Sequence, residues 1–120
     1  TVGYQILGPN KSVLFIPDID KWSKWDQNLG EILTTVDFAF IDATFFDSSE
    51  INYRSIGEIP HPLVKETIDQ LSLYSKKIKG KVYFIHMNHT NPMLDPDSEA
   101  SKWVLKQGFN IARLGQKFSL

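Results

Sequence analysis

The sequence contains no cysteine among its 120 residues. A disulfide framework and a thiolate metal site are therefore excluded, and histidine and carboxylate side chains are the strong metal ligands that remain. Positive and negative charges nearly balance, with a formal net charge of −1. This balance gives no support to nucleic-acid binding, because a polyanion held by bulk charge needs a strongly basic protein.

Long apolar runs and two common motifs are also missing. No stretch approaches the roughly 20 apolar residues of a membrane span, and no charged-then-apolar leader opens the chain. The sequence therefore predicts no membrane partner and, by default, a cytoplasmic location. It has neither a glycine-rich phosphate loop nor a Gly-x-Ser-x-Gly elbow, so the nucleotide-binding and serine-hydrolase classes lack their motifs.

Length and composition fit one globular domain. A chain of this size buries roughly two thirds of its unfolded surface, and 42% of the residues are hydrophobic. Thr1 is not an initiator methionine, and residues 2–7 already have the pattern of a strand. We therefore expect residues 1–120 to form a partial domain of a longer protein.

Apolar runs and helical periodicity alternate along the chain. The runs predict strands at residues 3–7, 12–16, 38–41, 82–85 and 109–112, and the periodicity predicts helices over 23–34, 62–79 and 95–107. Residues 8–11, Gly-Pro-Asn-Lys, predict a turn that closes a hairpin between the first two strands. Residues 45–60 are polar and loop-like. The alternation predicts an α/β fold with a mainly parallel sheet.

Polar side chains follow three of the predicted strands. Consecutive parallel strands end at the same edge of a sheet, where ligands of open α/β folds bind. We therefore expect one edge to collect the polar residues at these strand ends and in the proline-flanked loop, namely Asp18, Asp20, Asp42, Thr44, His61, His86, Asn88, His89 and Asn91. A neutral histidine at a rigid strand end suits metal binding, and the convergent acids favour a mixed histidine and carboxylate site.

Several of these residues also have a structural interpretation. His86 can be a hydrogen-bonded structural residue, Asp20 can cap the following helix, and Asp42 can anchor a loop through backbone hydrogen bonds. For His61, held between two prolines, a role in substrate binding or proton transfer stays open. His89 and its polar neighbours can form a turn that satisfies its own hydrogen bonds.

Four segments together resemble the metallo-β-lactamase superfamily, in the branch of coenzyme PQQ biosynthesis protein B. They are LFIPDID (residues 14–20), IDATFF (41–46), IPHP (59–62) and FIHMNHTNP (84–92), and they span nearly the whole chain. The resemblance implies the C-terminal half of an αββα sandwich, formed by a β-hairpin followed by βαβαβ elements. The N-terminal half of that fold, with its His-x-His-x-Asp-His motif, does not occur in these residues.

The resemblance also implies a metal site. It maps the ligand aspartate onto Asp18, with Asp20 as the alternative, and the late strand-end histidine onto His86. The implied cofactor is a divalent metal, chiefly zinc with two ions in the intact protein, or else iron or manganese.

The function that this implies is a metal-dependent hydrolase acting on a small-molecule substrate. His61 or His89 would handle protons, while Asp20, Asp42, Thr44, Asn88 and Asn91 would bind substrate or support the ligands. The alternative is a non-catalytic carrier or an oxidative enzyme in cofactor biosynthesis. The expected protein partner is the N-terminal half of the same protein or a second copy of the chain.

Overall fold

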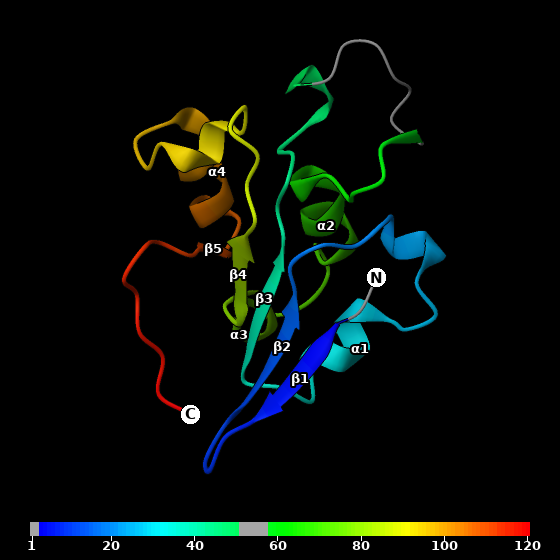
Figure 1. Cartoon of the computed structure of the whole chain (residues 1–120), viewed down its shortest axis with the longest axis vertical. Coiled ribbons are helices and arrows are strands. Elements are labelled where there is room, and N and C mark those ends of the chain that lie inside the picture. The colour runs from blue at the N-terminus through cyan, green and yellow to red at the C-terminus, as the bar shows by residue number, and fades with distance from the viewer. Residues whose placement is uncertain (1–2, 51–57) are drawn as a thin grey trace.

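A five-stranded sheet forms the centre of the protein in the computed structural model, which describes residues 3–50 and 58–120 (Figure 1). The strands lie in the order β1-β2-β3-β4-β5. Their bounds are β1 Tyr4–Leu7, β2 Ser12–Ile16, β3 Phe38–Asp42, β4 Val82–Ile85 and β5 Asn110–Ile111. β1 pairs with β2 in antiparallel fashion, and the remaining pairs are parallel. The hairpin and the parallel sheet are therefore as predicted.

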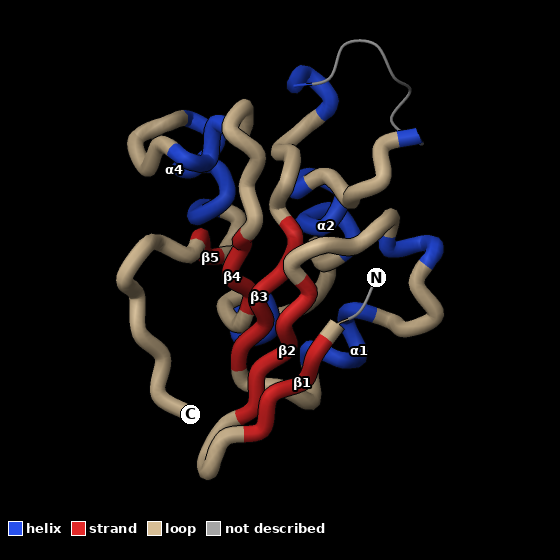
Figure 2. The backbone as a smooth tube through the Cα atoms, viewed as in Figure 1, coloured by secondary structure: helices blue, strands red, loops and turns tan. Residues whose placement is uncertain are grey.

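Short helices fill the connections between the parallel strands. The α-helices are α1 Leu29–Leu33, α2 Val64–Gln70, α3 Lys76–Lys79 and α4 Glu99–Lys106, and 3-10 turns occupy Trp22–Lys24, Ser48–Glu50 and Pro92–Leu94. α1, α2 and α3 lie behind the sheet in the view of Figure 2. No helix in the described ranges is both long and apolar enough to cross a membrane.

The core lies between the sheet and these helices. Alternate strand residues point to opposite faces of a sheet, and the helical face carries Leu14 and Ile16 of β2, Ala39 and Ile41 of β3, and Phe84 of β4. All five are buried. The burial of these positions fixes which face of each strand meets the helices.

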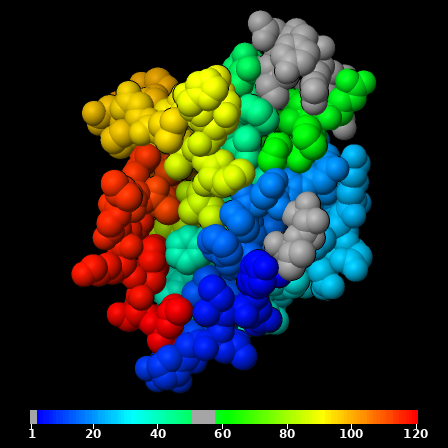
Figure 3. All heavy atoms as spheres, viewed as in Figure 1, coloured from blue at the N-terminus to red at the C-terminus, as the bar shows by residue number. Residues whose placement is uncertain are grey.

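The opposite face of the sheet is also apolar but only partly covered. Phe40 of β3 and Tyr83 of β4 pack edge-to-face against Phe118 of the C-terminal segment, with ring centroids 4.9 and 4.8 Å from that of Phe118. The carbonyl oxygen of Leu120 then accepts hydrogen bonds from the backbone of the β1–β2 turn, and Figure 3 shows the red C-terminal segment meeting the blue hairpin. Beside this segment a hollow of about 400 Å³ remains open, lined by Ile6 and other mainly apolar residues, with Arg113 and Gln116 among them.

The predicted helices are wrong in their extents. The stretch predicted as one helix over 23–34 is a 3-10 turn followed by the separate helix α1, because Trp25 is extended and Asn28 caps α1 by accepting a hydrogen bond from the Glu31 N–H. The stretch over 62–79 divides into α2 and α3, and Ser75 caps the second.

The third predicted helix is wrong at its start. It begins at Glu99 and not at residue 95, because Ser98 caps it by accepting a hydrogen bond from the Ser101 N–H. In the loop predicted at 45–60, Ser48–Glu50 form a 3-10 turn, and residues 51–57 lie outside the described ranges.

Candidate functional site

Three parallel strands and one loop bring polar side chains to a single edge of the sheet. Asp18 follows β2, Asp42 ends β3 and His86 follows β4. The ligand atoms of Asp18, Asp42 and His61 lie within 4.8 Å of one another, and Nδ1 of His86 is 3.1 Å from Oγ1 of Thr44. The prediction that Asp18, Asp42 and His86 share one edge is confirmed. We call Asp18, Asp42, Thr44, His61 and His86 the rim cluster.

Asp42 is the buried centre of the rim cluster, with no solvent exposure. Its Oδ1 accepts hydrogen bonds from the backbone N–H and the hydroxyl of Thr44, at 2.8 and 2.7 Å. Its Oδ2 accepts from the N–H of Ile19 at 3.0 Å and lies 2.8 Å from Nδ1 of His61. Because both oxygens are already engaged, Asp42 suits the role of an anchor for its neighbours better than that of a metal ligand.

His61 lies in the rim cluster because its loop is hydrogen-bonded to the residues just after β3. Phe45 and Leu63 form a parallel bridge, and the Val64 N–H donates to the Phe45 carbonyl at 3.0 Å. The imidazole lies 18% exposed beside Asp42 and packs edge-on against Phe45. This connection places a histidine from the start of α2 next to strand-end residues far away in the sequence.

His86 has an unusual backbone conformation. Its φ is +64°, and among the described non-glycine residues it alone has a positive φ. Histidine enters this left-handed region more readily than most residues. The flanking backbone is fixed, because the Ala43 N–H donates to the Ile85 carbonyl at 2.7 Å and the Asn88 N–H to the Thr44 carbonyl at 2.9 Å. The exposed imidazole therefore projects from a well-defined turn.

Asp18 is the exposed acid of the rim cluster, with 64% of its side chain accessible. Its Oδ1 is 3.4 Å from Nδ1 of His61, so its carboxylate is a solvent-accessible metal-binding group beside the histidines. Carboxylate oxygen and imidazole nitrogen are both zinc ligands. The side chains close enough together to share a metal ion are those of Asp18, Asp42 and His61, and metal binding by Asp18 and His86 stays a prediction.

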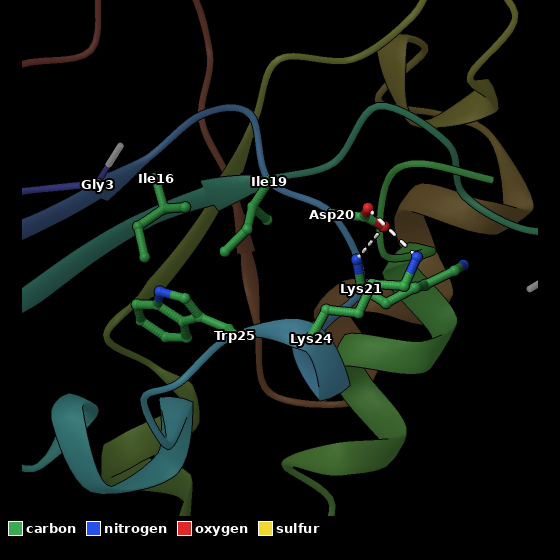
Figure 4. Close-up of a pocket in the computed structure, with 7 residues that line it drawn as sticks. All are labelled: Gly3, Ile16, Ile19, Asp20, Lys21, Lys24 and Trp25. Carbon is green, nitrogen blue, oxygen red and sulfur yellow. Dashed lines mark hydrogen bonds and ion pairs between the residues drawn. The ribbon is translucent and has the colours of Figure 1, made fainter. Parts of the chain in front are cut away.

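Asp20 lies apart from the rim cluster. It lines a cavity of about 180 Å³, and Figure 4 shows its carboxylate turned towards Lys21 and Lys24. Its carboxylate accepts from the Lys21 N–H at 2.7 Å, and this bond, together with the Lys24 ammonium 3.4 Å away, holds the pKa of Asp20 below its ordinary value. The structure therefore places Asp20 in the turn after β2 without a capping role, because Lys21 is the N-cap residue of the following 3-10 turn and no side chain caps it.

The polar residues after His86 hold the loop together. Asn91 is 2% exposed and donates to the Ala43 carbonyl at 2.7 Å. Asn88 donates through its side chain to the hydroxyl of Thr90, which donates to Glu50 at 2.9 Å. His89 is exposed in the same turn.

The structure adds one residue that sequence reasoning missed. Glu50 also accepts from the backbone N–H groups of Phe46 and Asp47, so it ties the loop after β3 to the loop after β4. No motif marks Glu50, because the link joins two loops whose proximity appears only in the fold.

Two relatives align along nearly the whole chain. Coenzyme PQQ synthesis protein B of Pseudomonas fluorescens (strain Pf0-1) is 26% identical over 119 residues, which cover 95% of this chain and 38% of that protein. Its counterpart in Gluconobacter oxydans (strain 621H) is 26% identical over 125 residues, covering 100% and 40%. The chain resembles coenzyme PQQ synthesis protein B. It spans about two fifths of the length of these curated relatives, and no family model matches it.

A solved structure of a PqqB protein has the same fold. The 1.98 Å crystal structure of Zn²⁺-bound PqqB from Methylobacterium extorquens matches with a TM-score of 0.78 at 21% identity, covering 100% of this chain and 44% of that chain. The chain therefore has a metallo-β-lactamase-type α/β fold like that of PqqB, as the four sequence segments predict. Its place in the C-terminal half of such a sandwich stays a prediction.

Proposed function

We propose that the rim cluster is part of the active site of a metal-dependent hydrolase of the metallo-β-lactamase type. One observation carries the proposal: Asp18, Asp42, His61 and His86, which come from four different segments, meet at one sheet edge. Histidines and carboxylates that converge in this way are typical of metal and catalytic sites.

In this proposal Asp18 and His86 hold the metal. Two protein ligands are fewer than the three or four that zinc sites use, so further ligands come from outside residues 1–120, and the intact protein holds two ions. When bound, zinc supplies hydroxide near neutral pH and polarises the substrate. The role of Asp42 is to orient its neighbours, because its oxygens are occupied by hydrogen bonds.

His61 is the proposed proton-transfer residue. With Nδ1 held 2.8 Å from the Asp42 carboxylate, the ring is fixed in orientation and its Nε2 stays available. An imidazole braced by a buried carboxylate is a common arrangement for general acid and base catalysis. His61 is better placed for this role than His89, since His61 lies within the rim cluster and His89 in the following turn.

The test is activity that depends on metal. The full-length gene product is purified, its metal content is measured by mass spectrometry, and it is assayed on chromogenic phosphodiester, ester and β-lactam substrates with and without a chelator. We expect bound zinc and at least one hydrolytic activity that the chelator abolishes and zinc restores. A protein that carries no metal and hydrolyses none of these substrates would contradict the proposal.

A variant of His86 separates metal binding from folding. His86→Asn removes the imidazole and keeps a residue that tolerates the positive φ of this position. We expect metal content to fall at least several-fold with little change in the unfolding midpoint, whereas His89→Asn in the same turn should leave both unchanged. Equal metal content in wild type and His86→Asn would show that His86 is a structural residue.

A second candidate function follows from the relatives. Their shared name, coenzyme PQQ synthesis protein B, favours a carrier or an oxidative enzyme in the synthesis of that cofactor. Titration of the gene product with PQQ, followed by the absorbance of the quinone, distinguishes the candidates. Saturable PQQ binding without hydrolytic activity would favour this second function.

We also propose that the open sheet face is covered in the whole protein, by another part of the same protein or by a second copy. Two features support a partner: the exposed side chains of Tyr4 and Ile6, at 60% and 46%, and the hollow beside Phe118. Monomers seldom leave a large contiguous apolar patch bare.

Substitution of Ile6 tests this coverage. If the face is buried in the gene product, Ile6→Ser should lower the free energy of unfolding by about 1.5–3 kcal/mol, the value of burying such a side chain. If the face is bare, the loss should stay below about 1 kcal/mol. Leu73→Ser, at a side chain 99% exposed, is the control and should change little in chemical denaturation.

A further inference from the structure

The hydroxyl of Thr44 lies between Asp42 and both histidines of the rim cluster. Its Oγ1 is 2.7 Å from Oδ1 of Asp42, 3.1 Å from Nδ1 of His86 and 3.3 Å from Nδ1 of His61. Thr44 is 8% exposed and Asp42 fully buried. The Asp42 carboxylate and the two imidazoles therefore all contact one buried hydroxyl.

The position of each hydrogen follows from what the groups can donate. A carboxylate only accepts, and a hydroxyl has one hydrogen to give. Because Thr44 gives its hydrogen to Asp42, its oxygen can offer His86 only a lone pair. Nδ1 of His86 must then carry the proton of that contact, which leaves a lone pair on Nε2 of the neutral ring.

The same reasoning applies to His61. Its Nδ1 is 2.8 Å from Oδ2 of Asp42, 3.3 Å from Oγ1 of Thr44 and 3.4 Å from Oδ1 of Asp18. Each of these oxygens acts as an acceptor towards it, so Nδ1 of His61 carries the hydrogen. Both imidazoles therefore hold their Nδ1 protons towards the Asp42 and Thr44 pair and keep Nε2 free.

We propose that Thr44 is a positioning residue that sets the tautomer of His86, with Asp42 as the common anchor of both histidines. Asp42 acts on His61 directly and on His86 through the Thr44 hydroxyl. The tautomer assignment stands on hydrogen-bond geometry alone, while its value for metal binding rests on the proposed function. A histidine that binds a metal through Nε2 needs this tautomer, and partners that fix it raise metal affinity.

The backbone of Thr44 allows its side chain to be tested separately. The Asn88 N–H donates to the Thr44 carbonyl, and the Thr44 N–H donates to Asp42, and both bonds survive replacement of the side chain. Thr44→Val removes the hydroxyl at nearly constant shape, and Thr44→Ser restores it. Thr67→Val is the matched control, because Thr67 is also buried and accepts from Nε1 of Trp22 at 2.8 Å without contacting either histidine.

The experiment reads the tautomer directly in the metal-free, full-length gene product. Two-bond ¹H–¹⁵N correlation spectra are recorded with ¹⁵N-histidine at a pH where the rings are neutral, and signals are assigned with His61→Asn and His86→Asn. We expect both histidines in the Nδ1–H form in wild type. In Thr44→Val, His86 should shift towards the Nε2–H form while His61 keeps its tautomer; Thr44→Ser and Thr67→Val should match wild type.

Zinc affinity is measured on the same variants by competition with a chelating dye. We expect Thr44→Val to weaken zinc binding by about 10–100-fold, the usual effect of losing a partner that orients a ligand, and Thr44→Ser to restore it. An Nε2–H tautomer of His86 in wild type, or an unchanged tautomer in Thr44→Val, would overturn the inference. Zinc affinity that is unchanged in His86→Asn, together with a His86 tautomer that changes in Thr44→Val, would instead contradict the proposed function and leave the positioning role in place.

Discussion

Replacement of Asp42 by alanine is expected to damage both the stability and the site of this protein. Asp42 is buried and accepts four hydrogen bonds, from Thr44 twice and from Ile19 and His61 once each. Removing it leaves those donors without their acceptor in a buried setting. We expect the free energy of unfolding to fall by at least about 3 kcal/mol, because each buried donor left unsatisfied costs about 1–3 kcal/mol.

Asp42→Asn sharpens the same prediction. The amide has the shape of the carboxylate, but one of its two ends becomes a donor that faces groups which are themselves donors. Asp42→Asn should therefore also be strongly destabilised and lose the fixed tautomer of His61. Asp37→Asn is the control, because Asp37 is exposed and accepts one backbone hydrogen bond, from Ser12 at 2.9 Å. Urea denaturation of full-length variants measures the difference, and equal midpoints for Asp42→Asn and Asp37→Asn would contradict the central role of Asp42.

The second large effect is expected in the core between sheet and helices. Phe84 of β4 has no solvent exposure, and its ring centroid lies 5.8 Å from that of Phe109. Phe84→Ala would remove a large buried side chain and leave a cavity, so we expect a loss of about 3–5 kcal/mol. Leu73→Ala, at an exposed site, should change the unfolding midpoint little. A loss below about 1 kcal/mol for Phe84→Ala would show that the helices do not pack on this face as described.

The sheet could be predicted from the sequence because each strand carries its own signal. Continuous runs such as residues 12–16 and 82–85 are apolar on both faces, as expected for a buried parallel sheet. The parallel strand order implies that these strands end at one edge of the sheet, and therefore that Asp18, Asp42 and His86 lie close together. This part of the site required only that parallel strands end together.

The helices were harder to predict because the apolar stripes continue across breaks in the backbone. Trp22, Leu29 and Leu33 belong to one apolar stripe. The backbone nevertheless leaves the helical conformation after the 3-10 turn that contains Trp22, and Asn28 caps a new helix that begins at Leu29. The capping residues mark these breaks in the sequence, since Asn28, Ser75 and Ser98 each accept a hydrogen bond from the first turn of a helix.

The hydrogen bonding inside the rim cluster could not be predicted either. The sequence offers Asp42, Thr44 and His61 as polar residues near one edge, but the anchoring role of Asp42 depends on its complete burial. The contact of His61 with Asp42 depends on the bridge between Phe45 and Leu63. Such contacts arise from how the loops pack, which no spacing in the sequence specifies.

Anomalous diffraction at the zinc edge tests the central claim most directly. Crystals of the full-length gene product grown with zinc would show where the ion binds. We predict an anomalous peak at bonding distance from the Asp18 carboxylate and from Nε2 of His86, with Nδ1 of His86 still on the Thr44 hydroxyl and Asp42 bound to no ion. A peak on Asp42, or no peak at the rim cluster at saturating zinc, would contradict the account.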